Sequence, residues 1–260
     1  AWDGNTWGRL VPGQNSLNRT ARALAVHDGR LVVAGDFDQV AGQAAGRLAE
    51  WDGVAWRTPL SGLGGIAWAL AEFRGELVVA GDFGQAADVP AWNLARWDGR
   101  AWRGFGDGGA LDGTVSALAL YQGELYAGGT FRSAGGVPCS QIARWDGSAW
   151  HPVQEGVDGR IWTMAVYDGA LYVGGSFLTA GGGVARRVAR WDGLGWHAVG
   201  DGCDGTVRDI KVWNGFAYFG GSFSSAGGVS ARGVARLDGH GWSALGSGVR
   251  GGVNRLMVYH

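Results

Sequence analysis

The 260-residue chain contains few of the residues that mark several common classes of protein. Two Cys are too few for a disulfide framework or a Cys-rich zinc site. The formal net charge is -1 and Lys211 is the single Lys, so the basic excess of a generic nucleic-acid or membrane-surface binder is missing. No run of 18 apolar residues is present, so we expect no membrane span. The N-terminus carries no basic-then-apolar signal sequence, which is expected where such a segment never existed or has been removed.

Glycine and tryptophan, in contrast, are abundant, with 51 Gly and 15 Trp. Disordered chains are poor in aromatic residues, so the tryptophan content predicts an ordered protein. An ordered chain with this much glycine is expected to contain many tight turns.

Internal repeats dominate the sequence. The triplet Trp-Asp-Gly begins at residues 2, 51, 97, 145 and 191, and Leu-Asp-Gly begins at Leu237, which gives spacings of 49, 46, 48, 46 and 46 residues. A second Trp follows five residues after each start, and each interval contains a run similar to LYAGGTF at 125–131. A period of this length falls in the range of propeller blades.

Each repeat predicts four short strands, A to D, without sustained helical periodicity. Strands A and B are joined by dipeptides such as Asp28-Gly29 and Asn214-Gly215, which favour two-residue hairpins because both positions take positive φ. We expect strands C and D to be joined in the same way by the Asp-Gly of the triplet. The sequence therefore predicts an all-β protein built from four-stranded antiparallel sheets.

The succession of an apolar strand, x-Gly, Leu-Tyr-x-Gly-Gly and aromatic-Asp-Gly-x-x-Trp resembles a shortened kelch repeat. It is more similar to the cell-surface and cortical cell-polarity repeat proteins that carry WDGxxW and LYVGGxF. The resemblance extends over nearly the whole chain and implies a kelch-like β-propeller used for binding. The enzymes of this type, which resemble galactose oxidase, depend on a copper site, and no matching set of ligands occurs in the sequence.

We interpret residues 1–260 as a single β-propeller domain with six-fold pseudosymmetry, five blades being the alternative. The complete repeat units are predicted at approximately 21–60, 66–106, 115–155, 161–201 and 207–247. An incomplete closing blade is expected from residues 1–11, which match the end of a strand C and a strand D, and residues 253–260, which match a strand A. An open blade of this kind invites strand addition by another chain.

Candidate binding residues lie on the B–C and D–A connections, which share one end of every unit, called here the variable end. Binding residues collect on loops held by a rigid scaffold, and we expect these residues to line the mouth of a central channel. Arginine provides a planar fork for carboxylates, and tryptophan provides a stacking surface. The candidate residues are Arg22, Arg47, Trp68, Trp92, Trp162, Arg186, Arg187, Arg208, Arg232, Asn254 and Arg255.

These residues predict a non-catalytic interaction scaffold that binds protein or peptide at the variable end. A carbohydrate-binding propeller is one alternative, and a structural protein that completes its open blade with another chain is a second. A lectin would repeat the same polar ligands in each blade, whereas these positions differ from unit to unit. We expect no catalytic residues, because no acid, base or metal cluster is recognisable.

Several other features are assigned structural roles. The Asp residues of the repeated triplet are expected to cap turns, and Cys139 and Cys203 to be unpaired. The five His lack metal-ligand spacing, and no phosphate loop occurs, so neither a metal nor a cofactor is predicted. We expect a glycan or a protein or peptide as partner, no nucleic acid, and a location outside the cell or on its surface.

Overall fold

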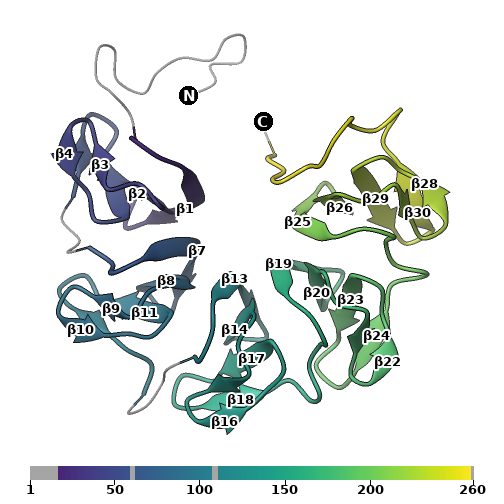
Figure 1. Ribbon diagram of the computed structural model, residues 1–260, viewed down its shortest axis with the longest axis horizontal. Coiled ribbons are helices and arrows are strands. Elements are labelled where there is room, and N and C mark those ends of the chain that lie inside the picture. Colours follow the sequence, from purple (N-terminus) through teal and green to yellow (C-terminus); the bar gives the residue numbers. More distant parts are fainter. Residues whose placement is uncertain (1–16, 59–61, 107–110, 259–260) are drawn as a thin grey trace. The chain divides into compact units, whose positions relative to one another are not determined.

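The computed structural model describes residues 17–58, 62–106 and 111–258, and all regular elements within these ranges are β-strands (Figure 1). The chain divides into two compact units, Ala1–Phe105 and Gly106–His260, and each is described by itself. No helix long and apolar enough to cross a membrane occurs among the described residues.

The first unit contains two four-stranded antiparallel sheets. The first sheet has the order β1-β2-β5-β6 and the second β7-β8-β11-β12, each following the predicted A-B-C-D sequence. Their strands are β1 (Ala21–His27), β2 (Arg30–Gly35), β5 (Leu48–Trp51), β6 (Trp56–Arg57), β7 (Ile66–Phe73), β8 (Glu76–Asp82), β11 (Leu94–Trp97) and β12 (Trp102–Arg103).

The second unit contains three sheets of the same kind, here the third, fourth and fifth. The third sheet has β13 (Val115–Tyr121), β14 (Glu124–Gly129), β17 (Ile142–Trp145) and β18 (Trp150–Pro152). The fourth has β19 (Ile161–Tyr167), β20 (Ala170–Gly175), β23 (Val188–Trp191) and β24 (Trp196–Ala198). The fifth has β25 (Val207–Trp213), β26 (Phe216–Gly221), β29 (Val234–Asp238) and β30 (Gly241–Ala244).

The turns between strands A and B are two-residue hairpins, as predicted. In the first sheet His27 pairs with Arg30 across Asp28 and Gly29, whose φ angles are 47° and 71°. The equivalent non-glycine residues Arg74, Gln122, Asp168 and Asn214 also have positive φ, between 47° and 54°. These turns match the right-handed twist of the strands that they join.

In the first four sheets the connections between strands C and D correct the sequence prediction, because they are four residues long. In the fifth sheet Asp238 pairs with Gly241, and only Gly239 and His240 lie between them. Trp51 pairs with Trp56, so residues 52–55 form the loop. The Asp52 Oδ1 atom accepts hydrogen bonds from the N–H groups of Val54 and Ala55 at 2.9 and 2.8 Å. The aspartate thus closes the loop with its side chain, which confirms the expected turn-capping role but removes the need for a tight Asp-Gly hairpin.

The spacing of the two Trp residues follows from this loop. Trp51 and Trp56 face each other across the β5–β6 pair, with ring centroids 5.4 Å apart. The second, third and fourth sheets repeat the pair at 5.4, 5.4 and 5.5 Å. Each of these four WDGxxW motifs therefore encodes one cross-strand aromatic pair.

Each B–C connection contains a short hairpin that the sequence analysis did not predict. The hairpins are β3 (Gln39–Val40) with β4 (Gln43–Ala44), β9 (Gln85–Ala86) with β10 (Val89–Pro90), β15 (Ser133–Ala134) with β16 (Val137–Pro138), β21 (Thr179–Ala180) with β22 (Gly183–Val184), and β27 (Ser225–Ala226) with β28 (Val229–Ser230). The segment before each strand A supports the hairpin of its own sheet. The Asp158 Oδ1 atom, for example, accepts hydrogen bonds from Leu178 and Thr179 N–H at 2.7 and 2.9 Å.

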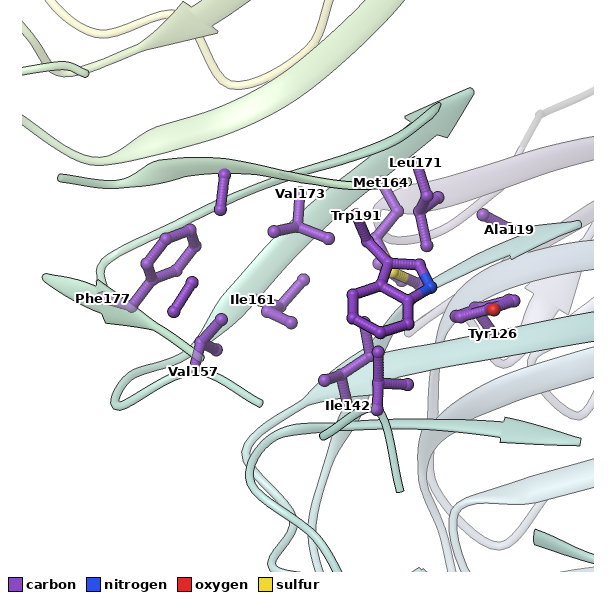
Figure 2. Packing of buried hydrophobic residues seen from close by; sticks show 14 of the residues in the cluster. Ala119, Tyr126, Ile142, Val157, Ile161, Met164, Leu171, Val173, Phe177 and Trp191 are labelled. Carbon is purple, nitrogen blue, oxygen red and sulfur yellow. The ribbon is translucent and has the colours of Figure 1, made fainter. Parts of the chain in front are cut away.

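Consecutive sheets within a unit pack face to face around apolar side chains. One cluster joins the third and fourth sheets and includes Tyr126, Ile142, Ile161, Leu171 and Trp191 (Figure 2). Glycine in strand B permits the close approach. A Cβ atom at Gly174 would lie 2.6 Å from Val207 Cγ1 of the fifth sheet, closer than real Cβ contacts.

The C-terminal segment differs from the predicted sixth strand A. Its described residues, 253–258, belong to no strand. The segment nevertheless packs on the fifth sheet as the next strand A would, because a Cβ atom at Gly220 would lie 2.7 Å from Val253 Cγ1. Residues 1–11, the other part of the predicted closing blade, lie outside the described residues.

The fold is thus all-β with repeated four-stranded antiparallel sheets, an architecture consistent with a propeller. One sheet falls within each of the five complete repeat units. The number of blades, the pseudosymmetry and the single-domain organisation stay predictions.

Candidate functional site

The eleven predicted binding residues are divided between the two units. Arg22, Arg47, Trp68 and Trp92 belong to the first unit. Trp162, Arg186, Arg187, Arg208, Arg232, Asn254 and Arg255 belong to the second. Within each unit the residues form separate local groups, whose partners are described below.

In the first unit, three of the predicted residues form a group with Asp36, which follows β2. The Arg22 Nη2 atom lies 3.1 Å from Asp36 Oδ2, and the Arg22 guanidinium stacks over the Trp68 ring at 4.0 Å from its centroid. Arg47 Nη1 donates a hydrogen bond to the Asp36 carbonyl at 2.8 Å. Trp92 is not part of this group and is 57% exposed.

In the second unit, Asp209 links the start of β25 to the C-terminal segment. Its carboxylate is 2% exposed, and its Oδ2 atom accepts a hydrogen bond from Leu256 N–H at 2.7 Å. Arg255 Nη1 and Lys211 Nζ lie 3.9 and 3.6 Å from Asp209 Oδ1. Arg208 donates a hydrogen bond to Asn254 Oδ1 on the adjacent surface. These contacts hold the C-terminal segment against the fifth sheet.

Trp162 and Arg187 also have partners within the second unit. The Arg160 guanidinium lies over the Trp162 ring, 3.6 Å from its centroid. Arg187 Nη1 donates to the carbonyl of Cys203 at 3.3 Å, whereas the neighbouring Arg186 is exposed. Cys203 and Cys139 are both free, as predicted. Burial raises the pKa of each thiol to about 12, so neither is a reactive thiolate at neutral pH.

A pocket of about 430 Å³ opens at the variable end of the fifth sheet. Its wall is formed by the connection between β26 and β29, by the segment after β30, and by Asp204, which precedes β25. Arg232, one of the predicted residues, lines the pocket together with Arg250. Neither guanidinium forms an ion pair or hydrogen bond with another described residue. The pocket therefore combines a concave surface with two available cationic groups.

The acidic group of the pocket, Asp204, is largely committed to the protein itself. Its Oδ1 atom accepts hydrogen bonds from Ser224 and Ser225 N–H at 2.8 and 2.9 Å, and its Oδ2 atom accepts one from the Ser224 hydroxyl at 2.6 Å. Burial acts to raise the pKa of Asp204, but these hydrogen bonds outweigh it and the pKa is lowered. Asp204 is therefore ionised at neutral pH.

Arg232 was predicted from the sequence as a binding residue, whereas Arg250 and Asp204 were not. A signal for both was present in the repeats. Asp112, Asp158 and Asp204 occupy equivalent positions before strands A, and Arg250 stands at that position after the last complete unit. This replacement of an acidic residue by a basic one marks the pocket. The ion pair between Asp36 and Arg22 and the stacking of Arg160 on Trp162 were not predicted, because both depend on packing between strands.

Comparisons with known proteins bear on the fold. Residues 27–50 match the family model of a domain of unknown function (DUF5122) described as a beta-propeller, a span that runs from the end of β1 into β5. No curated protein matches the chain.

Among solved structures, the crystal structure of the computationally designed Ika8 protein is similar, with a TM-score of 0.59 and 15% sequence identity over 92% of this chain. This chain spans 65% of the length of the Ika8 chain. The computationally designed Ika4 protein matches with a TM-score of 0.41 and 17% identity, over 72% of this chain and 98% of its own. The likeness to Ika8 concerns the fold alone.

Proposed function

We propose that this protein is a non-catalytic interaction scaffold that binds an acidic segment of a protein or peptide at the variable end of its fifth sheet. The β-propeller character of the fold suggests a scaffold. The observation that carries the proposal is the pocket, in which Arg232 and Arg250 lack an anionic partner among the described residues. Guanidinium groups pair with carboxylates through parallel hydrogen bonds, so an acidic segment is the complementary ligand.

The other predicted arginines support this choice of location. Arg22 and Arg47 are already engaged by Asp36, and Arg187 by the Cys203 carbonyl. Binding a ligand there would require these contacts to break. The backbone supplies further donors at the pocket, because the N–H groups of Gly251 and Gly252 donate no hydrogen bond to a described residue.

The carbohydrate-binding alternative has less support. Trp68 and Trp162 each have a guanidinium stacked on the ring, at 4.0 and 3.6 Å, so one face of each ring is occupied. Trp92 is the most exposed of the three predicted tryptophans and is not among the residues that line the pocket. The absence of catalysis and the extracellular location stay predictions.

The proposal is tested by binding of a fluorescent Glu-rich peptide, measured by anisotropy. Replacement of both Arg232 and Arg250 by Ala should weaken the affinity about tenfold, because two charge-assisted contacts are lost. Arg100→Ala is the matched control, since Arg100 is exposed in the C–D loop at the opposite end of its sheet. Unchanged affinity in the double variant, or an equal loss in the control, refutes the proposal.

A further inference from the structure

The pocket of the fifth sheet is located where the other sheets place a side chain. The residue that directly precedes strand C has positive φ in all five sheets. It is Arg47, Asn93, Gln141 and Arg187 in the first four sheets, with φ between 61° and 75°. In the fifth sheet it is Gly233, with φ of 71°. The backbone is therefore alike in all five, and only the fifth lacks the side chain.

The two arginines at this position reveal what the surrounding backbone binds. Arg47 Nη1 donates to the Asp36 carbonyl at 2.8 Å, and Arg187 Nη1 donates to the Cys203 carbonyl at 3.3 Å. In the repeat alignment, Ser222 corresponds to Asp36, and Val249 corresponds to Cys203. A guanidinium in the chain itself thus occupies the equivalent space in two other sheets.

The corresponding carbonyl groups of the fifth sheet are left available. Ser222 and Val249 both line the pocket, and neither carbonyl accepts a hydrogen bond from another described residue. A Cβ atom at Gly233 would lie 3.1 Å from the Gly251 carbonyl oxygen and 3.5 Å from that of Val249. The space of the missing side chain is consequently surrounded by hydrogen-bond acceptors, which require a donor.

We infer that this pocket is a socket for one arginine side chain of the partner, placed within the acidic segment of the proposed function on which this inference rests. The guanidinium of the partner takes the place that Arg187 fills in the fourth sheet and donates to the Ser222 and Val249 carbonyls. The ionised Asp204 adds negative charge to the same wall. Acidic residues on either side of the partner arginine pair with Arg232 and Arg250 and offset their repulsion of its charge.

Peptides of the form acetyl-Glu-Glu-X-Glu-Glu-amide test the socket by isothermal titration calorimetry. With X as Arg, the peptide should bind about tenfold more tightly than with X as Gln, because charge-assisted hydrogen bonds to the carbonyls are lost in the Gln peptide. In the Gly233→Arg variant the protein fills its own socket, as it does with Arg187, and the preference for Arg should disappear. Arg residues at φ of 65° and 75° in the other sheets indicate that the backbone tolerates this change.

Gly233→Ala is the control, because it imposes the same backbone strain and adds a Cβ atom but leaves most of the socket empty. It should retain the preference for the Arg peptide. Thermal unfolding of both variants identifies any loss of folding. Equal affinities of the Arg and Gln peptides for the native protein overturn the inference and leave the proposed function intact, as does a preference that survives in Gly233→Arg. Failure of every acidic peptide to bind overturns both.

Discussion

The fourth and fifth sheets have the same strand order and the same register, including an irregularity near the start of the first strand pair, yet they differ in what surrounds them. The fourth sheet is covered on one side by β25 of the next sheet, and Arg187 fills its variable end. The fifth sheet is covered by residues 253–258, which form no strand, and Gly233 leaves its variable end open.

The residues that form the sheets therefore differ from the residues that determine the surface at the variable end. The strands of both sheets pair in the same register, although the fifth sheet has Leu237 where the fourth has Trp191. Two positions outside the strands distinguish the basic pocket from the filled end. Gly233 stands in the fifth sheet where the fourth has Arg187, and Arg250 follows the fifth sheet where Asp204 follows the fourth. Loops on a conserved framework can therefore acquire binding surfaces at little cost to the fold.

The largest expected effect comes from filling the glycine positions at which the two sheets meet their neighbours. Gly174→Val should lower the free energy of unfolding by about 3 kcal/mol, because its Cβ would collide with Val207 and Thr163, both held in strands. Gly220→Val should cost about 1 kcal/mol, since Val253 belongs to a segment that can shift. Urea unfolding measures both.

Equal destabilisation by these two valine variants would contradict the difference drawn between a strand and the C-terminal segment. Gly215→Ala is a useful reference for a glycine substitution without crowding. No atom lies within 4 Å of a Cβ built at Gly215, although its φ of 77° still imposes strain.

A smaller effect is expected from the aspartates that support the short hairpins. Asp158→Ala and Asp204→Ala each remove the acceptor of two backbone N–H groups and should each cost about 1 kcal/mol of stability. Only Asp204→Ala should also weaken binding of the Arg-containing peptide, because Asp204 lines the pocket of the fifth sheet. A loss of binding in Asp158→Ala of the same size would show that the hairpins act through general stability.

The smallest effect concerns the C–D loops. The N–H groups of Leu194 and Gly195 and the His197 side chain lower the pKa of Asp192 to about 2. The folded-state pKa lies below the usual value of about 3.9, so the stabilisation by ionised Asp192 is complete above about pH 4 and is lost as the pH falls toward 2. The native protein should therefore have a higher thermal unfolding midpoint than Asp192→Asn above about pH 4, and this difference should shrink as the pH falls toward 2.

Asp238→Asn provides the comparison in the fifth sheet, where Asp238 Oδ1 accepts a backbone hydrogen bond from His240 N–H but none from the following residue. It controls for removing one charge from a C–D loop. If the difference in thermal midpoint between the native protein and Asp192→Asn stayed constant between pH 5 and pH 2, ionisation of Asp192 would not be the source of the stabilisation.

Much of the fold was predictable because its determinants are local. The x-Gly dipeptides specified the A–B turns, and the WDGxxW spacing located strands C and D on either side of a short loop. The length of that loop was predicted wrongly in the first four sheets, where an aspartate side chain, such as that of Asp52, replaces the backbone hydrogen bonds of a tighter turn. The short hairpins were missed because two-residue strands carry no alternating pattern, and their support comes from residues about 20 positions earlier, such as Asp158.

The candidate site was predictable only in part. Sequence variation between the repeats selected Arg232 among eleven residues but could not distinguish it from Arg22 or Arg47. The distinction depends on whether an acidic or carbonyl partner lies within reach. For Arg22 that partner is Asp36, which directly follows β2 and is brought near Arg22 by the pairing of β1 with β2.

By itself, the sequence determined the four main strands of each complete repeat and the turns between strands A and B, because backbone conformation at glycine and the alternation of apolar side chains act over a few neighbouring residues. The tertiary structure alone decided which arginines are satisfied and which remain available. Their partners come from distant parts of the chain, and an absent side chain becomes a pocket only when the surrounding segments fold around the space it leaves.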